Sequence, residues 1–358
     1  MASDIARILL LTLGYFIVLI SLVPLIRRDN WVFRVFEYPR AQKLIINAAI
    51  LAGFLFVAHW DNLHDVVFSV VLGINLLYLA YQVFPYTILG RKQMKAQKHS
   101  EEGRNFRLLI CNVYQYNRDI DACIQCIRRE DPDIVILVET DDWWELQLRQ
   151  IHKTYPHRIL KPQNNTYGML LFSRLELLDP EIKFLVESDV PSFHMRVRLP
   201  SGEVFRLHSL HPRPPIPQEN PRSTERDAEL LIVAKEAEKS SLPVVVAGDM
   251  NDVAWSYTTE LFMKISKLLD PRRGRGFFNT FHAHHWFLRW PLDHVFCSTH
   301  FLLRDLRRLA PMGSDHFPIL VELGLSGARE KKKARSQQVL EPEPEERKEA
   351  QKKIAKVK

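Results

Sequence analysis

The sequence contains little cysteine, and its central part has no excess of positive charge. Four cysteines among 358 residues are too few for a scaffold built on disulfides. The chain has a net charge of +7, but residues 105–328 contain 27 basic and 29 acidic side chains. A domain that grips long nucleic acid usually carries a strongly basic surface, and the composition of this segment does not provide one in bulk.

The overall composition excludes two further classes of protein. An apolar fraction of 46% and a charged fraction of 25% are typical of a folded chain, not of a wholly disordered one. A mean hydropathy of −0.15 excludes a transporter in which membrane helices occupy the whole chain.

Three stretches near the N-terminus lack charged residues altogether. They are residues 8–26, 44–60 and 66–89, and a helix that crosses a bilayer needs about 20 such residues. We predict a membrane anchor over residues 1–90 with three transmembrane helices. A cleaved signal peptide is the alternative for the first stretch, but no small-residue cleavage site follows it. A buried or re-entrant helix is the alternative for the second, which is short.

Basic residues between the stretches predict the orientation of the anchor. The segment between the second and third stretches has no Lys or Arg, whereas the other two flanking segments are basic, with Arg27, Arg28, Arg34, Arg40 and Lys43, and with Arg91, Lys92, Lys95 and Lys98. Basic flanks stay in the cytoplasm. We therefore expect a multi-pass protein of the inner (cytoplasmic) membrane, with everything after residue 90 in the cytoplasm and its thiols reduced.

Two polar segments frame the remaining part of the chain. Residues 91–104 are basic and are predicted to be a juxtamembrane linker that touches anionic lipid. Residues 329–358 combine runs of Lys and Glu with few apolar residues, so we predict a charged tail that is disordered or at most transiently helical. A single domain over residues 105–328 lies between them.

This domain alternates short apolar runs with helical patterns. Residues 118–130 and 222–240 have the apolar spacing of helices. Runs of strand length occupy residues 106–113, 134–138, 168–173, 195–199, 204–210, 244–247, 292–296 and 319–323.

Polar residues able to do chemistry stand at the ends of these runs. They are Asn112, Glu139, His211, Asp249 with Asn251, Asp293 with His294, and Asp315 with His316. Such groups converge on one rim of a sheet, where carboxylates can hold a hard divalent cation and a His paired with an Asp can carry a proton. Each residue alone fits a turn or a helix cap, but six such groups in one domain favour a site.

The motifs around these residues resemble the endonuclease/exonuclease/phosphatase family. Over residues 105–326 the matching motifs are CNV with Asn112, LVET with Glu139, YGMLLFS with Tyr167, LHPRPP with His211, AGDMND with Asp249 and Asn251, PLDHVF with Asp293, and GSDHFP with Asp315 and His316. The resemblance implies a four-layer α/β/β/α sandwich with two mostly antiparallel sheets, preceded here by the three spans. It implies cleavage of a phosphoester with Mg²⁺ or Mn²⁺. The spans are also similar to a membrane-anchored bacterial form of the family.

The resemblance also implies roles for the residues. Glu139 would be the principal metal ligand, with Asn112 beside it. Asp315 would either ligate the metal or hold the turn of its motif. His211, Asp249, Asn251, Asp293 and His316 would be catalytic, with Asp293 fixing the tautomer of His316, and Tyr167 would contact substrate. Whether Asp249 or His316 takes the proton of the attacking water stays open.

Three features depart from the family pattern or lie outside it. His294 stands where the family often has Tyr, and it fits either a core imidazole or a catalytic one. His282, His284 and His285 form an HxHH cluster that is substrate-facing, structural or, less simply, a zinc site. Cys123 and Cys126 form a CxxC on one predicted helix without a second pair, which favours core or helix-surface thiols over a redox or zinc site.

We therefore predict a membrane-anchored, divalent-metal-dependent phosphoesterase. Its substrate would be nucleic acid, or a lipid or inositol phosphate, and the sequence decides neither this nor endo against exo cleavage nor the oligomeric state. The alternative is a catalytically inactive membrane scaffold that binds phosphate-bearing partners. A transporter or sensor is disfavoured because the spans carry no charge in their middles.

Overall fold

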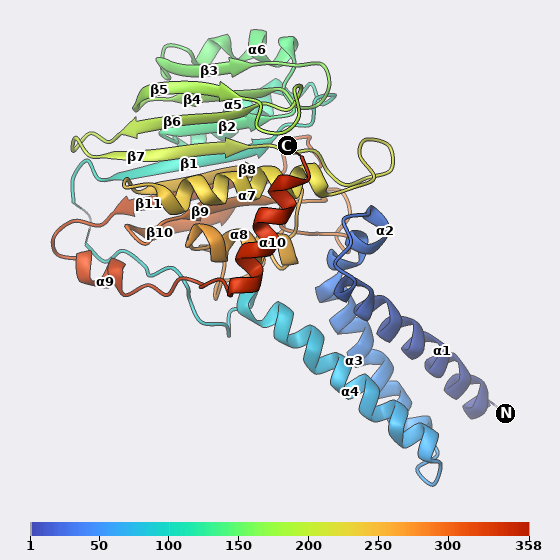
Figure 1. The fold of residues 1–358 in the computed structure, drawn as a ribbon. Helices are drawn as coiled ribbons and strands as arrows, with labels where there is room; N and C mark the ends of the chain where they lie inside the picture. Colours follow the sequence, from blue (N-terminus) through green and yellow to red (C-terminus); the bar gives the residue numbers. More distant parts are fainter. Residues whose placement is uncertain (1, 100, 358) are drawn as a thin grey trace.

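The structure, a computed structural model, describes residues 2–99 and 101–357. Figure 1 shows two parts: a bundle of three long helices that projects to the lower right, and a larger domain built on two β-sheets. The short helix α2 (Trp31–Arg34) lies at the junction between them.

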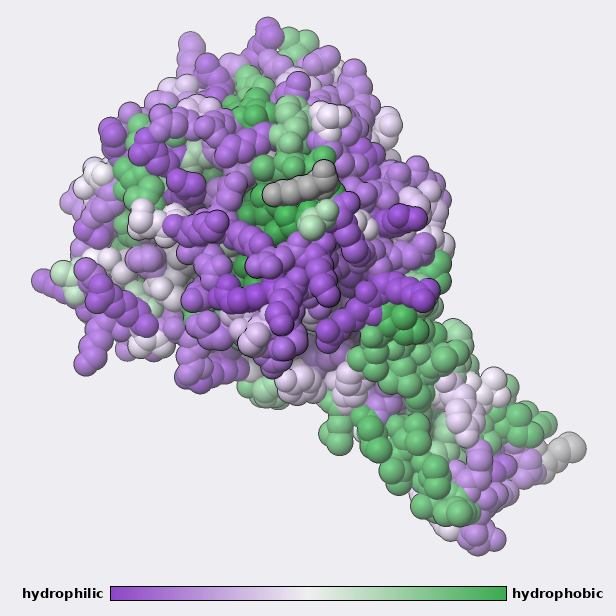
Figure 2. All heavy atoms as spheres, in the orientation of Figure 1, coloured by the Kyte–Doolittle hydropathy of each residue, from purple (hydrophilic) through white to green (hydrophobic). Residues whose placement is uncertain are grey.

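The bundle consists of three helices that are long and apolar enough to cross a membrane. They are α1 (Ala2–Leu22), α3 (Arg40–Val57) and α4 (Leu63–Val83), and the apolar stretches extend over Ser3–Leu25, Arg40–Val57 and Leu63–Tyr86. Each helix begins three to six residues earlier than the sequence pattern predicted. Their outward side chains are largely apolar, so this part of Figure 2 is mostly green. Inside the bundle, the Asn75 amide donates to the Asn47 side-chain oxygen at 2.9 Å.

The domain contains a six-stranded and a five-stranded sheet. The first has the spatial order β10 (Phe301–Arg308), β11 (Ile319–Leu325), β1 (Asn105–Asn112), β2 (Ile134–Val138), β4 (Met169–Ser173) and β3 (His157–Lys161). The second has the order β5 (Glu176–Lys183), β6 (Ser192–Arg198), β7 (Val204–Leu210), β8 (Val244–Asp249) and β9 (Asp293–Cys297). Only β1–β2 and β7–β8 pair in parallel, so both sheets are mostly antiparallel, as predicted.

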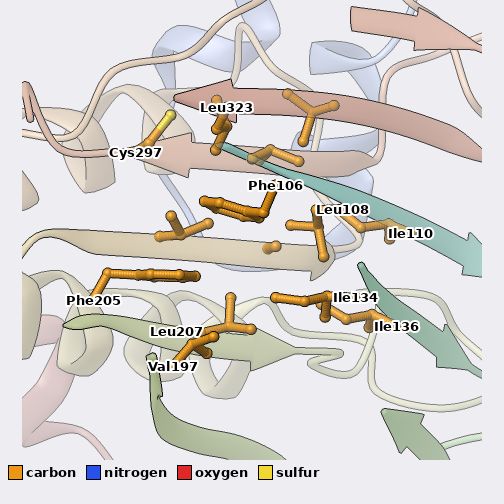
Figure 3. Packing of buried hydrophobic residues seen from close by; sticks show 14 of the residues in the cluster. Phe106, Leu108, Ile110, Ile134, Ile136, Val197, Phe205, Leu207, Cys297 and Leu323 are labelled. Atoms are coloured by element: carbon orange, nitrogen blue, oxygen red, sulfur yellow. The ribbon is translucent and has the colours of Figure 1, made fainter. Parts of the chain in front are cut away.

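The two sheets face each other across the main apolar core. Figure 3 shows Phe106, Leu108 and Ile134 of one sheet opposite Phe205 and Leu207 of the other. The rings of Phe106 and Phe205 stack with centroids 4.7 Å apart. Burial of this apolar surface, by the alternate residues of each strand, is the main force that holds the sheets together.

Helices cover the outer face of each sheet and complete the four-layer sandwich. α5 (Ile120–Glu130) and α6 (Asp142–Leu148) pack on the six-stranded sheet, and α7 (Thr224–Lys239) and α8 (Tyr257–Ser266) pack on the five-stranded sheet. In α5 the buried face includes Cys123, Ile124 and Ile127. Cys126 is also buried, so both thiols of the CxxC are free cysteines in the core, as predicted.

The strands that the apolar pattern did not predict are β3, β5 and β10. Each is an edge strand of its sheet. β5 is exposed along most of its length, and β10 carries four charged residues. An edge strand buries less surface, so its sequence lacks the continuous apolar run by which the central strands were recognised. The short helices α6 and α8 were also not predicted.

The linker and the tail differ from their predicted states. Met94 is buried in the core between the sheets, and the Gln97 amide donates to the Leu303 carbonyl at 2.8 Å, so the linker runs along β10. The tail forms α9 (Lys331–Arg335) and α10 (Pro344–Ala355) in place of a disordered segment. In α10, Ala350 and Ile354 pack beside α7 and α8.

A specific ion pair explains why the tail was mispredicted. The buried ammonium of Lys353 in α10 lies 2.8 Å from an Asp227 carboxylate oxygen and 2.9 Å from Asp29. A prediction from composition treats Lys353 as a charge exposed to solvent. In the fold its ammonium instead pairs with the Asp227 and Asp29 carboxylates. Two apolar residues at i and i+4 then suffice to dock the helix.

Candidate active site

The predicted site residues meet at one rim of the sandwich. Asn112 and Asp249 are the last residues of β1 and β8, Glu139 and His211 directly follow β2 and β7, Asp293 begins β9, and His316 precedes β11. The carboxyl ends of the parallel pairs and the amino ends of β9 and β11 lie at the same edge, because the latter strands run antiparallel to their neighbours. Asp249 and Asp293 stand directly opposite each other in the β8–β9 ladder.

Unusual backbone conformations mark this rim. Gly248 has φ +144°, and a Cβ there would come within 2.0 Å of the Leu210 carbonyl oxygen, so glycine is needed immediately before Asp249. Glu139 and Asn251 have φ +59° and +49°, in the left-handed region that non-glycine residues rarely adopt. Such strained turns are enriched where a backbone must present a side chain for function.

Asn112 bridges two carboxylates from different sheets. Its Nδ2 donates to Oε1 of Glu139 at 2.7 Å and to Oδ2 of Asp249 at 3.1 Å, while its Oδ1 accepts from the Tyr114 amide at 2.9 Å. In this arrangement the amide nitrogen, which cannot bind a cation, faces the carboxylates. Asn112 therefore links Glu139 of one sheet to Asp249 of the other.

His316 lies between two aspartates. Its Nδ1 is 2.8 Å from Oδ2 of Asp293, and its Nε2 is 3.6 Å from Oδ2 of Asp249. Burial by itself would lower the pKa of this imidazole, but the charges of Asp293 and Asp249 outweigh it and raise the pKa to about 10. The ring is thus held in its charged form with Nε2 toward the rim.

Glu139 is a buried carboxyl group surrounded by other acidic groups. Burial is the main reason that its pKa rises to about 7, and the negative charges of Asp315 and Asp249 add to the increase. The Asn112 hydrogen bond and the His316 charge oppose it. Asp315 itself is half-buried, beside His316 in the same loop.

These residues fit a divalent cation. The carboxyl groups of Glu139, Asp249, Asp293 and Asp315 gather around the single imidazolium of His316, so the named groups carry an excess of negative charge. A bound dication would favour the charged form of Glu139, which burial disfavours. Ligand atoms of Asp249, Asp293 and His316 also lie within 4.8 Å of one another, although Nδ1 of His316 is already bonded to Asp293.

His211 and Tyr167 lie together beside this group. Their ring centroids are 5.5 Å apart, and Nδ1 of His211 is buried with no hydrogen-bond partner among the residues that the structure describes. Burial lowers the pKa of His211 to about 4, so its ring is neutral. The Tyr167 hydroxyl donates to the Glu219 carboxylate, and the Arg213 guanidinium stacks over the Tyr167 ring with its carbon 4.6 Å from the centroid.

Asn251 closes the turn after β8. Its backbone amide donates to Oδ1 of Asp249 at 2.9 Å, and its side-chain Nδ2 donates to the Pro212 carbonyl at 3.0 Å. The Asn251 carbonyl accepts from the Tyr38 hydroxyl at 3.0 Å and from Arg226 at 2.6 Å. Tyr38 comes from the segment between the first two predicted spans, so the anchor contributes to the setting of this turn.

His294 is a structural residue of the core. It is fully buried, Arg272 donates to its Nδ1 at 2.6 Å, and its Nε2 bonds the Asp252 carbonyl at 2.7 Å. Burial and the Arg272 charge hold the pKa of His294 well below its ordinary value. This supports the core interpretation over the catalytic one.

The HxHH cluster forms part of a loop beside the rim. The His282 ring lies 4.5 Å from that of His285 and 5.4 Å from that of His284, and the preceding Phe281 ring is 5.0 Å from the His316 ring. His284 and His285 are exposed. Within residues 2–99 and 101–357, none of the three belongs to a group of His, Cys, Asp and Glu close enough to hold a metal.

A different pair of histidines, which the sequence did not single out, lies on the outer face of the five-stranded sheet. His194 of β6 and His208 of β7 are cross-strand partners with their Nδ1 atoms 2.6 Å apart. Oε2 of Glu236 on α7 lies 3.8 and 4.0 Å from these nitrogens. Successive residues of a strand point to opposite faces of the sheet, so this pair faces away from the main core, whereas the site lies at the rim.

Sequence reasoning also missed supporting residues of the rim. The Ser314 hydroxyl donates to the Asn112 carbonyl at 2.7 Å and accepts from the His316 amide at 3.0 Å, which ties β1 to the GSDHFP motif. The Thr280 hydroxyl accepts from the Asp293 amide at 3.1 Å. Ser314 could have been found inside its motif, whereas nothing local to Thr280 or Tyr38 indicates the contact.

Comparisons with known proteins give a family match for the domain. A sequence model of the Endonuclease/Exonuclease/phosphatase family matches residues 109–316, which is more than half of the chain. A search of curated proteins found no match.

Solved structures share the fold at low sequence identity. A D. rerio TDP2 structure complexed with single strand DNA product has a TM-score of 0.52 and 15% identity, over 62% of this chain and 99% of that one. An endonuclease/exonuclease/phosphatase from Beutenbergia cavernae has a TM-score of 0.51 and 17% identity, over 63% and 72%. One from Bacteroides vulgatus has a TM-score of 0.50 and 18% identity, over 62% and 99%.

Proposed function

Because the chain belongs to the endonuclease/exonuclease/phosphatase family, we propose that it is a membrane-anchored phosphoesterase that uses Mg²⁺ or Mn²⁺. Members of this family are metal-dependent hydrolases that act on phosphoester bonds. The observation that carries the proposal is the continuous contact from Glu139 through Asn112 and Asp249 to His316 and Asp293 across both sheets. An inactive scaffold, the alternative, would not need this charged arrangement.

We assign Glu139 and Asp315 to hold the cation. When bound there, it would withdraw negative charge from the phosphoryl oxygens. The remaining residues act on the water and the ester. Charged His316 points Nε2 to the rim, where it can neutralise a phosphoryl oxygen, and Asp293 fixes its orientation.

Asp249 is then our choice for the group that accepts the proton of the attacking water. His316 is already protonated in the neutral range and cannot take a second proton, whereas Asp249 lies within 3.6 Å of it at the same rim. Asn251 holds the Asp249 carboxylate through its backbone amide. Neutral His211 offers a buried, unpartnered nitrogen to the phosphate or leaving group, and Tyr167 packs beside it.

The test is hydrolysis of bis(p-nitrophenyl) phosphate by the purified full chain in detergent. We expect activity with Mg²⁺ or Mn²⁺, none with a chelator, and a loss of about 10²–10⁴-fold in Glu139→Ala, the scale of one catalytic group. Glu176→Ala, at the exposed edge strand β5, is the matched control and should behave as wild type. Undiminished activity in the chelator would refute the proposal.

We also propose that the domain lies on the cytoplasmic side, on the evidence of the basic segments that flank the spans. An alkaline phosphatase reporter joined after the third span should be inactive, and one joined within residues 58–62 should be active. The reverse pattern would contradict this orientation.

A further inference from the structure

A large apolar cavity opens beside the catalytic rim. It has a volume of about 560 Å³, and Glu139, Asp315 and His316 form its polar end. Most of its remaining walls are apolar and include Trp31, Ile216 and Trp290. A cavity of this size and character is typical of a small-molecule site, and here it is continuous with the groups that act on a phosphoester.

One wall of the cavity comes from the membrane anchor. Residues 31–39 connect α1 to α3 and are firmly joined to the domain. The Trp255 indole donates to the Glu37 carbonyl at 2.9 Å, and the Arg34 guanidinium lies 3.1 Å from Asp227. The spans therefore do more than tether the domain, because the segment between two of them shapes its candidate active site.

The lip of the cavity lies where α3 begins. The Gln42 side chain, in the first turn of α3, donates to the Phe287 carbonyl at 2.8 Å. The loop that carries the HxHH cluster continues into this contact and exposes Trp286, Phe287 and Leu288. The Trp286 side chain is 80% exposed, and Leu288 also lines the cavity. Exposed aromatic and apolar side chains next to a span are typical of the membrane–water interface.

The charge of the cavity does not suit a polyanion. Of the described residues that line it, Arg34 alone is a Lys or Arg, and its guanidinium already contacts Glu37 and Asp227. A groove that tracks a nucleic-acid backbone offers free cations along its length. An apolar wall that offers no free cation and begins beside the candidate membrane spans favours a hydrocarbon occupant.

Resting on the proposed hydrolase function, we propose that the substrate is a membrane lipid with a phosphodiester headgroup. Its headgroup phosphate would reach Glu139 and His316, while the adjoining apolar part occupies the cavity between Trp31, Ile216 and Trp290. The lipid would come from the leaflet next to the domain. Hydrolysis adds water across one P–O bond: the water oxygen bonds to phosphorus, its proton passes to Asp249, and the leaving oxygen takes up a proton to give an alcohol and a phosphomonoester.

The experiment compares esters that differ only in their acyl chains. The full chain in detergent is assayed with dihexanoyl phosphatidylglycerol and phosphatidylethanolamine and with their deacylated counterparts, glycerophosphoglycerol and glycerophosphoethanolamine. A single-stranded oligonucleotide and bis(p-nitrophenyl) phosphate complete the panel. We expect kcat/KM for at least one lipid to exceed that of its deacylated form by tenfold or more, the scale of an occupied apolar pocket.

Variants test whether the cavity causes this preference. Ile216→Trp and Val35→Trp fill it from two walls, and each should reduce the ratio of lipid to deacylated kcat/KM about tenfold. Leu146→Trp, on the exposed face of α6, is the matched control and should keep the ratio. Thermal melting identifies a Trp variant that fails to fold, and the other variant then carries the test.

The outcomes separate the two proposals. If bis(p-nitrophenyl) phosphate is hydrolysed but neither lipid is preferred to its deacylated form, or the oligonucleotide is the better substrate, the lipid inference is overturned and the phosphoesterase stands. An unchanged ratio in both Trp variants also overturns the assignment of the cavity. If no ester is hydrolysed with Mg²⁺ or Mn²⁺, the proposed function itself fails.

Discussion

Buried histidines at two places in the same domain differ in charge: His316 at the rim is cationic, whereas His194 and His208 on the outer face are neutral. At the rim, His316 contacts Asp293 at 2.8 Å, and the pKa of its imidazole is raised to about 10. On the outer face of the five-stranded sheet, burial lowers the pKa of His194 to about 2 and of His208 to about 3, and nearby positive charges including Arg206 add to both effects. Glu236, a third exposed, lies 3.8 Å or more from them.

The comparison shows that partners, and not burial alone, decide what a histidine can do. Desolvation opposes the charged form in both places. Of the two places, only the rim has two buried carboxylates that outweigh desolvation, so there the fold maintains an imidazolium next to the proposed phosphate site. The outer pair shares one hydrogen bond between two neutral rings and is suited to stability rather than to catalysis.

The largest expected effect on activity comes from replacing His316 at the rim, with the replacement of His208 on the outer face as the comparison. His316→Gln should lower kcat/KM for bis(p-nitrophenyl) phosphate by about 10²–10⁴-fold, because it removes the charge at the rim. The matched His208→Gln variant should keep its activity. Similar losses in both variants would mean that fold stability, and not the charge of His316, explains the effect.

The Asp293 partner gives a sharper test. Asp293→Asn keeps the size of the side chain but removes its charge, so the pKa of His316 should fall. Since His316 is charged only below its pKa, activity should then decline at a lower pH than in wild type, and the alkaline limb of the kcat/KM profile should move down. The double variant with His316→Gln should lose little more than the worse single variant, because the residues act as a unit. Losses that multiply would contradict the pairing.

A smaller effect is expected on acid stability. The unfolded chain protonates His194 and His208 below their ordinary pKa of 6.5, whereas the folded protein keeps both neutral to much lower pH. Stability is therefore complete above pH 6.5 and falls as the pH decreases, by up to about 1.4 kcal/mol per pH unit for each histidine. Thermal melting of the His194→Gln/His208→Gln variant should depend less on pH between 6.5 and 4.5. An unchanged dependence would show that these rings are not neutral in the fold.

The smallest expected effect concerns the support of the outer pair. The Ser192 hydroxyl bonds Nε2 of His194 at 2.8 Å in a buried setting. Ser192→Ala should reduce the free energy of unfolding by about 1 kcal/mol, the net value of one such hydrogen bond. Activity should stay at the wild-type level, and a large loss of activity would link the outer face to the rim.

The strands that the sequence predicted correctly are mainly those whose residues are buried on both faces of the sheet. Central strands such as β1, β2 and β8 are continuous apolar runs, and the polar residue that ends each one was identified as a candidate for the site. The edge strands β3, β5 and β10 were missed because many of their residues are exposed or only partly buried, so they lack a continuous apolar run. The helix α10 was missed because its stability depends on Asp227, more than a hundred residues away, and not on its own composition.

By itself the sequence determined the family, the three apolar spans, the two-sheet sandwich and the residues whose strands end at the rim. These features depend on local patterns, namely apolar period, length and short motifs, which the chain carries at each position. Only the tertiary structure decided the charge of each buried histidine, the turn of Asn112 toward two carboxylates, and the use of residues 31–39 as a wall of the cavity. Those outcomes depend on distances between residues far apart in the chain, and electrostatic and packing energies are set by these distances.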